Sequence, residues 1–135
     1  MADERNHRSR VLVVEDDPAN RHLAIRILER AGYLVEQAEG GPRALEMAEA
    51  TPLDLVLMDL SMPGMDGFET TRRLRQLAGH ATTPVIALTA HAMTEDSQKA
   101  IAAGCDVVMV KPYRPAELIA TVTRVLGTPD IRTPD

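Results

Sequence analysis

Short apolar runs alternate with amphipathic helical patterns along this chain of 135 residues, and this alternation constrains its fold more than any other feature. The runs have the length of β-strands and are almost continuously apolar. They lie at Val11–Val14, Tyr33–Val35, Leu55–Met58, Val85–Leu88 and Val107–Val110. Strands of this kind are typical of a parallel sheet with helices on both faces. Since crossover connections are right-handed, the pattern predicts an α/β fold with a doubly wound five-stranded sheet.

The segments between the runs carry helix signals. Two of them have apolar residues at helical spacing, which places these residues on one helix face. These stripes are Leu23, Ala24, Ile27, Leu28 and Ala31, and Leu118, Ile119, Val122, Val125 and Leu126. Asp17-Pro18 is typical of an N-cap and first turn, and Gly41-Pro42 is expected to open the next helix. The glycines expected to close helices are Gly32, Gly79, Gly104 and Gly127.

The composition argues against several classes of function. The only aromatic residues are Tyr33, Phe68 and Tyr113, so a site built on stacked rings is not expected. A net charge of −5 argues against direct binding of nucleic acid. The apolar runs are too short to span a bilayer, and the polar start of the chain lacks a signal-peptide pattern. A single cysteine, Cys105, suits a reducing cytoplasm, and we expect it to be buried and inert.

One domain accounts for most of the chain. We expect residues 10–127 to form it, with residues 1–9 as a flexible N-terminal arm. Residues 128–135 contain Thr-Pro-Asp twice and are predicted to be an unstructured tail or the start of a linker.

Polar residues follow four of the apolar runs at the point where each expected strand ends. They are Glu15-Asp16-Asp17 after the first run, Asp59 after the third, Thr89 after the fourth and Lys111 after the fifth. Ligands bind at the carboxyl ends of the strands in sheets of this kind, where the strand order reverses. We therefore expect these side chains to converge on one rim of the sheet.

Each of these residues also has a structural explanation. Asp17 fits a helix N-cap, Glu15-Asp16 could be a solvated turn, and Thr89 is an ordinary strand residue. Asp59 is harder to explain as surface, because it closes a strand expected to be buried. Lys111 is one of only two lysines beside thirteen arginines, which indicates a position that needs a compact charge.

Taken together, the rim residues suit phosphoryl transfer. Clustered carboxylates repel one another unless a hard cation neutralises them, and Mg²⁺ prefers such ligands together with water and a phosphate oxygen. Asp59 would be the nucleophile that accepts the phosphoryl group. Lys111 and the Thr89 hydroxyl would bind the other phosphoryl oxygens.

At these residues the sequence resembles the response-regulator receiver family of two-component signalling, over about residues 10–127. Four segments carry the resemblance, in order and at the expected spacing. They are Val11–Asp17, Leu57–Gly67, Pro84–Ala90 and Val110–Pro112. The stretch Thr89-Ala90-His91-Ala92-Met93 is similar to receivers of hybrid kinases and of single-domain regulators.

The resemblance implies a flavodoxin-like (βα)5 fold with strand order 2-1-3-4-5. It implies that Asp59 accepts a phosphoryl group from a sensor histidine kinase or a histidine phosphotransfer protein. It makes Asp16, Asp59 and the backbone carbonyl of Ser61 ligands of Mg²⁺, with Glu15 acting through water. Lys111 would be the countercharge, commonly with a cis peptide to Pro112, and Thr89 the switch hydroxyl. The domain would act as a signalling switch and not as an enzyme.

The chain departs from the family pattern at one position. The family often has an aromatic residue three positions before the lysine, where this chain has Val108. Because valine cannot make a large rotation, a switch based on Thr89 and an aromatic partner is in doubt. The response is then expected in the surface formed by the fourth helix, the fifth strand and the fifth helix. Ser61 and His91, near the mouth of the site, are candidates for tuning dephosphorylation.

Other functions fit the sequence less well. A phosphatase with an aspartate nucleophile would place it after the first strand with a second aspartate two residues later, unlike Glu15-Asp16-Asp17. A flavin-binding module would need a phosphate loop and stacking aromatics. The serious alternative is a receiver-like scaffold that acts without phosphorylation, although the complete acidic, threonine and lysine set argues against it.

Overall fold

The structure is a computed structural model that describes residues 8–91 and 94–127. Five parallel strands form one sheet in the order β2-β1-β3-β4-β5. The strands are β1 (Arg10–Val14), β2 (Leu34–Ala38), β3 (Leu55–Asp59), β4 (Val85–Thr89) and β5 (Val107–Val110). The predicted fold class and strand order are therefore confirmed. The predicted arm and tail lie almost wholly outside the described residues and stay predictions.

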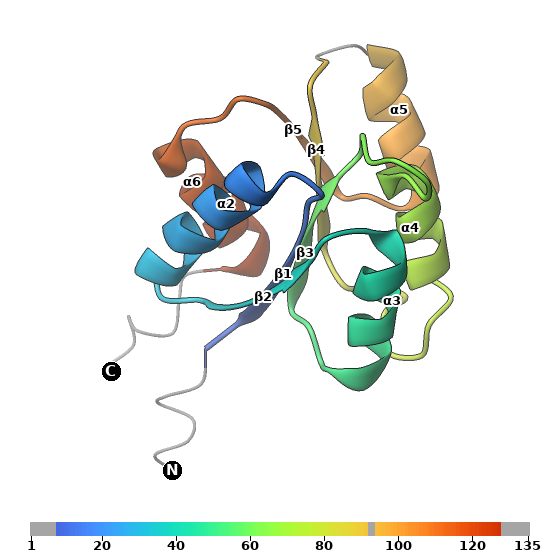
Figure 1. The fold of residues 1–135 in the computed structure, drawn as a ribbon, viewed down its shortest axis with the longest axis horizontal. Coiled ribbons are helices and arrows are strands. Elements are labelled where there is room, and N and C mark those ends of the chain that lie inside the picture. Colours follow the sequence, from blue (N-terminus) through green and yellow to red (C-terminus); the bar gives the residue numbers. More distant parts are fainter. Residues whose placement is uncertain (1–7, 92–93, 128–135) are drawn as a thin grey trace.

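Helices cover both faces of the sheet (Figure 1). They are α2 (Pro18–Arg30), α3 (Gly41–Ala50), α4 (Gly67–Leu74), α5 (Thr94–Ala103) and α6 (Pro115–Leu126). Helices α2 and α6 lie on one face, and α3, α4 and α5 lie on the other (Figure 1). Strands β1, β3 and β4 are buried along nearly their whole length because they have helices on both sides.

Two aliphatic cores lie on the two faces of the sheet. One includes Leu12, Val56 and Ala87 and packs under the α3–α5 layer. The other includes Val13, Leu57 and Leu88 and packs under α2 and α6. Successive residues of each strand thus point to opposite cores, as the pleat of a strand requires.

Three local predictions were wrong. The second strand is Leu34–Ala38 and not Tyr33–Val35, because it is an edge strand whose polar residues Glu36 and Gln37 also pair with β1. Gly79 does not close a helix: α4 already ends at Leu74, and Gly79 lies in the following loop with φ of 86°. Leu23 does not belong to the buried stripe of its helix, since it is 52% exposed.

Other helix signals behave as predicted. The Asp17 carboxylate accepts a hydrogen bond of 2.9 Å from the backbone N–H of Asn20 and caps α2. Pro18 occupies the first turn of α2, and Gly41-Pro42 opens α3. None of the helices in the described part of the chain combines the length and apolar character needed to span a membrane.

Candidate functional site

Three carboxylates meet at the carboxyl ends of β1 and β3. Asp59 is the last residue of β3 and Glu15 follows β1, and their exposures are only 1% and 3%. Asp16 is the next residue after Glu15 and is more exposed. One oxygen from each of the three lies within 4.8 Å of the others. The predicted convergence of Glu15, Asp16 and Asp59 is therefore confirmed.

Lys111 approaches this acidic group from the end of β5. Its Nζ donates a hydrogen bond of 3.2 Å to Asp59 Oδ1 and lies 3.6 Å from Glu15 Oε1. The backbone N–H of Lys111 donates to the Thr89 carbonyl at 2.7 Å, which holds the end of β5 beside the end of β4. The peptide bond between Lys111 and Pro112 is cis, as the resemblance implied.

The site holds more negative than positive charge. When ionised, three carboxylates face one ammonium, which leaves an excess of two negative charges. Burial, together with the charge of Asp59, raises the pKa of Glu15 to about 7. Burial alone would lower the pKa of Lys111, but the charges of Asp59 and Glu15 raise it above its ordinary value.

The loop after β3 and the end of β4 complete the rim. The backbone N–H of Ser61 donates to Asp59 Oδ1 at 3.2 Å, so Ser61 contacts the carboxylate through its amide, while its side chain is exposed. Thr89 is 2% exposed, and its Oγ1 accepts a hydrogen bond of 3.1 Å from the His91 backbone N–H. His91 itself is exposed at the mouth of the site. Val108 is half-buried against the core under α3–α5.

Gly67 packs directly against the backbone at Asp59 and Leu60, a role that was not predicted from the sequence. A Cβ atom at this position would lie 2.4 Å from the Asp59 carbonyl oxygen and 2.7 Å from the Leu60 Cα. Only glycine lets the first turn of α4 pack so close to the end of β3. The signal in the sequence was the glycine at the end of the matching segment Leu57–Gly67.

A pocket of about 340 Å³ opens beside Lys111, and it too was not predicted. Its lining residues are Glu15, Asn20, Leu23, Ala90, Lys111, Pro112 and Tyr113. Burial and then the charge of Glu15 raise the pKa of the Tyr113 phenol. Leu23 of α2 is exposed and lies beside Lys111 in this pocket. The sequence could not show this, because only the fold brings the two residues together.

These residues fit a Mg²⁺ ion. The donors are hard carboxylate oxygens, they carry an excess negative charge, and one of them is exposed enough to bind an ion that keeps several waters. Burial, and after it the charge of Asp59, raises the pKa of Glu15, so its carboxylate is costly to ionise unless a further positive charge is present. A divalent cation would supply the missing charge.

The fold and this rim define the class of α/β receiver domains that signal through an acidic site. The sequence model of the response regulator receiver domain matches residues 11–123, and the chain belongs to this family. The sequence of the sensor histidine kinase GacS of Pseudomonas protegens is 40% identical over 121 residues, which is 87% of this chain and 13% of the kinase. A small uncharacterized protein of Leptolyngbya boryana is 43% identical over 112 residues, which is 83% of this chain and 86% of that protein.

Solved structures of similar sequence have the same fold as this chain. Chemotaxis protein CheY4 of Vibrio cholerae superposes with a TM-score of 0.87 at 35% identity, covering 89% of this chain and all of that one. The receiver domain of a Pseudomonas aeruginosa sensor histidine kinase, described with a magnesium ion in its active-site cleft, superposes with a TM-score of 0.82 at 34% identity. That comparison covers 89% of this chain and 98% of the other. The present chain spans about an eighth of the hybrid-kinase relatives that it matches.

Proposed function

We propose that Asp59 is the phosphoryl acceptor of this receiver domain and that its phosphorylation changes the surface read by a partner protein. The observation that supports this most strongly is the position of the Asp59 carboxylate. It is buried at a strand end, is bonded to the Lys111 ammonium and lies among two further carboxylates. A carboxylate held in this way is positioned as a nucleophile.

The reaction requires little besides positioning and neutralisation of charge. A carboxylate oxygen of Asp59 forms the new bond to phosphorus while the bond from phosphorus to the donor imidazole nitrogen breaks. The electron pair leaves with the imidazole. Lys111 already contacts the Asp59 oxygen and would stabilise the negative charge of the phosphoryl oxygens. The Thr89 hydroxyl would donate to another of these oxygens.

Asp16, Asp59 and the backbone carbonyl of Ser61 would hold Mg²⁺ directly, and Glu15 would bind it through water. The bound ion would offset the repulsion between the carboxylates and an incoming phosphoryl group. Three carboxylates with oxygens within 4.8 Å of one another support this assignment.

A sensor histidine kinase or a histidine phosphotransfer protein is the phosphodonor that we propose, since the relatives include sensor histidine kinases. We propose that the donor docks beside the pocket at Lys111, next to the acidic site. Leu23, 52% exposed on α2, offers an apolar contact at the edge of this pocket. We place the domain in the cytoplasm as a protein-binding switch with no enzymatic turnover of its own and no direct contact to nucleic acid.

Thr89 is the residue through which the signal would leave the site. A phosphoryl group on Asp59 would draw the Thr89 hydroxyl away from the His91 amide that it now binds. Val108 is too short and stiff to fill the space that Thr89 leaves. The response is then a shift of backbone in the segment after Thr89 and in α5, and a partner would read α5, β5 and α6.

Phosphorylation by acetyl phosphate with Mg²⁺, followed by intact-mass measurement, tests the proposal. We expect a gain of one phosphoryl group in the wild type, none in Asp59→Asn and none when EDTA removes the metal. Asp66→Asn is the matched control, because Asp66 caps α4 through a bond to the Glu69 amide and asparagine caps equally well. A wild type that takes no phosphoryl group would favour the alternative, a scaffold that acts without phosphorylation.

A further inference from the structure

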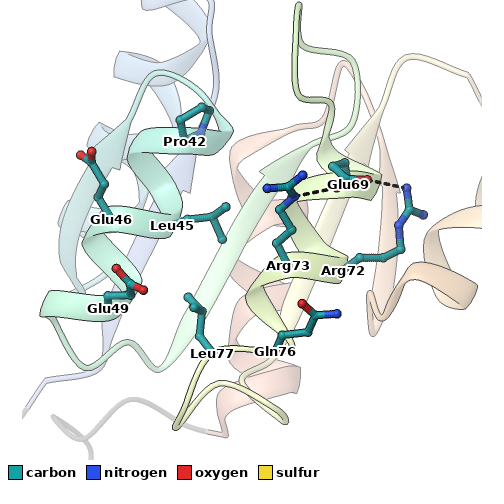
Figure 2. Close-up of a pocket in the computed structure, with 9 residues that line it drawn as sticks. All are labelled: Pro42, Leu45, Glu46, Glu49, Glu69, Arg72, Arg73, Gln76 and Leu77. Carbon is teal, nitrogen blue, oxygen red and sulfur yellow. Dashed lines mark hydrogen bonds and ion pairs between the residues drawn. The ribbon is translucent and has the colours of Figure 1, made fainter.

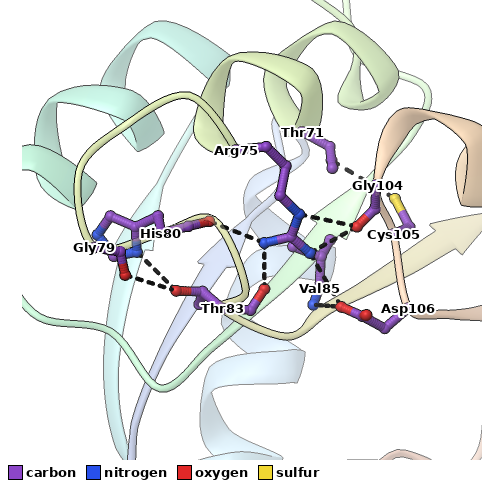
Figure 3. Close-up of polar contacts among 9 residues, drawn as sticks. All are labelled: Thr71, Arg75, Gly79, His80, Thr83, Val85, Gly104, Cys105 and Asp106. Atoms are coloured by element: carbon purple, nitrogen blue, oxygen red, sulfur yellow. Dashed lines mark hydrogen bonds and ion pairs between the residues drawn. The ribbon is translucent and has the colours of Figure 1, made fainter.

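Arg75 joins three segments of the chain at the end of the molecule opposite the acidic site. Its Nε and Nη2 donate to the Gly104 carbonyl at 3.1 and 2.6 Å (Figure 3). Its Nη1 donates to the carbonyls of His80 and Thr83 at 3.1 and 2.5 Å. Its Nη2 also contacts Asp106 Oδ2 at 3.1 Å. Arg75 was not predicted from the sequence to have a role.

The network fixes the end of α5 to the beginning of β4. Asp106 Oδ2 accepts a further hydrogen bond of 2.8 Å from the backbone N–H of Val85, the first residue of β4 (Figure 3). The Asp106 backbone N–H donates to the Val85 carbonyl, also at 2.8 Å. The Arg75 side chain is only 18% exposed, so its bonds to the backbone carbonyls are largely shielded from water, whereas the Asp106 side chain is 50% exposed and its ion pair with Arg75 is weaker.

The contact between Arg75 and the Gly104 carbonyl depends on glycine at position 104. Its φ is 114°, which a residue with a Cβ rarely adopts. A Cβ there would lie 3.1 Å from both Cγ and Nε of Arg75. The close approach lets the guanidinium reach the Gly104 carbonyl directly after the last residue of α5, where a positive charge is favourable to a helix C-terminus.

Other anchors of α5 are weak. Its buried apolar residues are the small Ala100 and Ala103, while Ile101 is 53% exposed. Lys99 places its Nζ 4.6 Å from the centre of the Phe68 ring on α4, but this contact is at the surface. Exposed contacts of this kind contribute only modestly to stability. Among the contacts of the described residues, those at the C-terminal end of α5 are therefore the strongest.

We propose that Arg75 is a positioning residue of the switch: it holds the C-terminal end of α5 as a pivot, so that phosphorylation displaces the N-terminal half of the helix. This inference rests on the proposed function and specifies which part of α5 responds. The Arg75 and Asp106 bonds hold the beginning of β4 in place, so we expect the displacement to start at the other end of the strand, at Thr89. Displacement should decrease along α5 from Thr94 toward Gly104.

Amide hydrogen exchange of the whole chain, with and without beryllofluoride and Mg²⁺, tests the pivot. In the wild type we expect the beryllofluoride-dependent change in α5 to be confined to residues 94–99, with residues 100–106 unchanged. Arg75→Met should make residues 100–106 exchange about tenfold faster and let the change extend through them, since it removes a set of charge-assisted bonds. Arg75→Lys keeps the positive charge but lacks the planar guanidinium with its several donors. Its exchange rates at residues 100–106 should lie between those of the wild type and of Arg75→Met.

Arg72→Met is the matched control, because the Arg72 guanidinium is bonded to Glu69 on the same helix and its side chain is 54% exposed. It should leave the exchange profile unchanged. An even beryllofluoride-dependent change across residues 94–106 of the wild type would overturn the pivot without the use of any variant. So would a folded Arg75→Met protein with the wild-type profile. No change anywhere in the wild type would contradict the proposed function itself, which distinguishes the two failures.

Discussion

At the scale of single residues, the burial of Asp59 and Glu15 determines the charge balance of the site. Both are nearly inaccessible to water, and Lys111 contacts both, yet one ammonium cannot balance them and Asp16 together. Leaving such charges uncompensated costs free energy. The same excess of negative charge favours binding of a cation, and Lys111 is in place to bind an anionic group such as a phosphoryl group.

With Asp16 proposed as a direct ligand of Mg²⁺ and Glu15 as an outer one, removing Asp16 should be more damaging than removing Glu15. We expect Asp16→Asn to reduce Mg²⁺-dependent phosphorylation by acetyl phosphate about a hundredfold, and Glu15→Gln by about tenfold. Initial rates measured over a range of Mg²⁺ concentrations should show the loss as a weaker apparent affinity for the metal. Equal effects of the two substitutions would mean that Glu15 is also a direct ligand.

The raised pKa of Glu15 predicts a pH-dependent stability in metal-free protein. The folded-state pKa of about 7 exceeds the ordinary value of 4.5, so this group stabilises the fold fully below 4.5 and the contribution is lost as the pH rises through 7. The loss is on the order of 2 kcal/mol between about pH 5 and about pH 8. Urea unfolding in EDTA measures it.

Glu15→Gln is the control for this pH dependence, because glutamine has a similar shape and does not titrate. Its stability should vary less over the same range of pH than that of the wild type. Mg²⁺ should stabilise the wild type more at the higher pH, where Glu15 is ionised. An identical pH dependence in the variant would mean that another group is responsible.

At the scale of elements, helix α2 has one side chain in the core and another exposed beside the site. Leu28 of α2 is fully buried, whereas Leu23, five residues earlier, is half exposed beside the site. The groove between α3 and α4 makes the same division, with Leu45 and Leu77 at its base and charged side chains at its rims (Figure 2). On that rim Arg72 and Arg73 are both bonded to Glu69 of their own helix (Figure 2).

The two leucines of α2 provide a matched test of this division. Leu28→Ala should lower the free energy of unfolding by about 2–5 kcal/mol, because it leaves a cavity in the core. Leu23→Ala should change it by no more than about 0.5 kcal/mol, as is usual for an exposed position. Urea unfolding of both variants decides the matter. A large loss for Leu23→Ala would show that this side chain has a structural role.

At the scale of the whole molecule, the fold and the position of the acidic site could be predicted from the sequence. Most of the strand and helix pattern was predictable because the strands other than β2 are short apolar runs and α2 and α6 have apolar residues at helical spacing, and the rim because parallel strands end at one edge. The four segments that resemble receivers led to the family, which the family match confirms. Roles of single residues such as Asp16 and Thr89 stay predictions.

Several features could not be read from the sequence, because they depend on tertiary contacts. Strand β2 has no strong hydrophobic pattern, because it lies at the edge of the sheet, pairs with β1 on one side and is only partly buried. Nothing local distinguishes Arg75 from Arg72 and Arg73, yet it alone of the three reaches across to Gly104. The exposure of Leu23 likewise follows from how α2 lies on the sheet and not from its helical spacing.

Locating the phosphoryl group on the chain shows whether Asp59 is the acceptor. After incubation with acetyl phosphate and Mg²⁺, borohydride reduces an aspartyl phosphate to homoserine, and peptide mass spectrometry identifies the modified position. We predict homoserine at position 59 and at no other aspartate of the wild type. Homoserine at position 16 or at another position, with Asp59 intact, would show that Asp59 is not the acceptor.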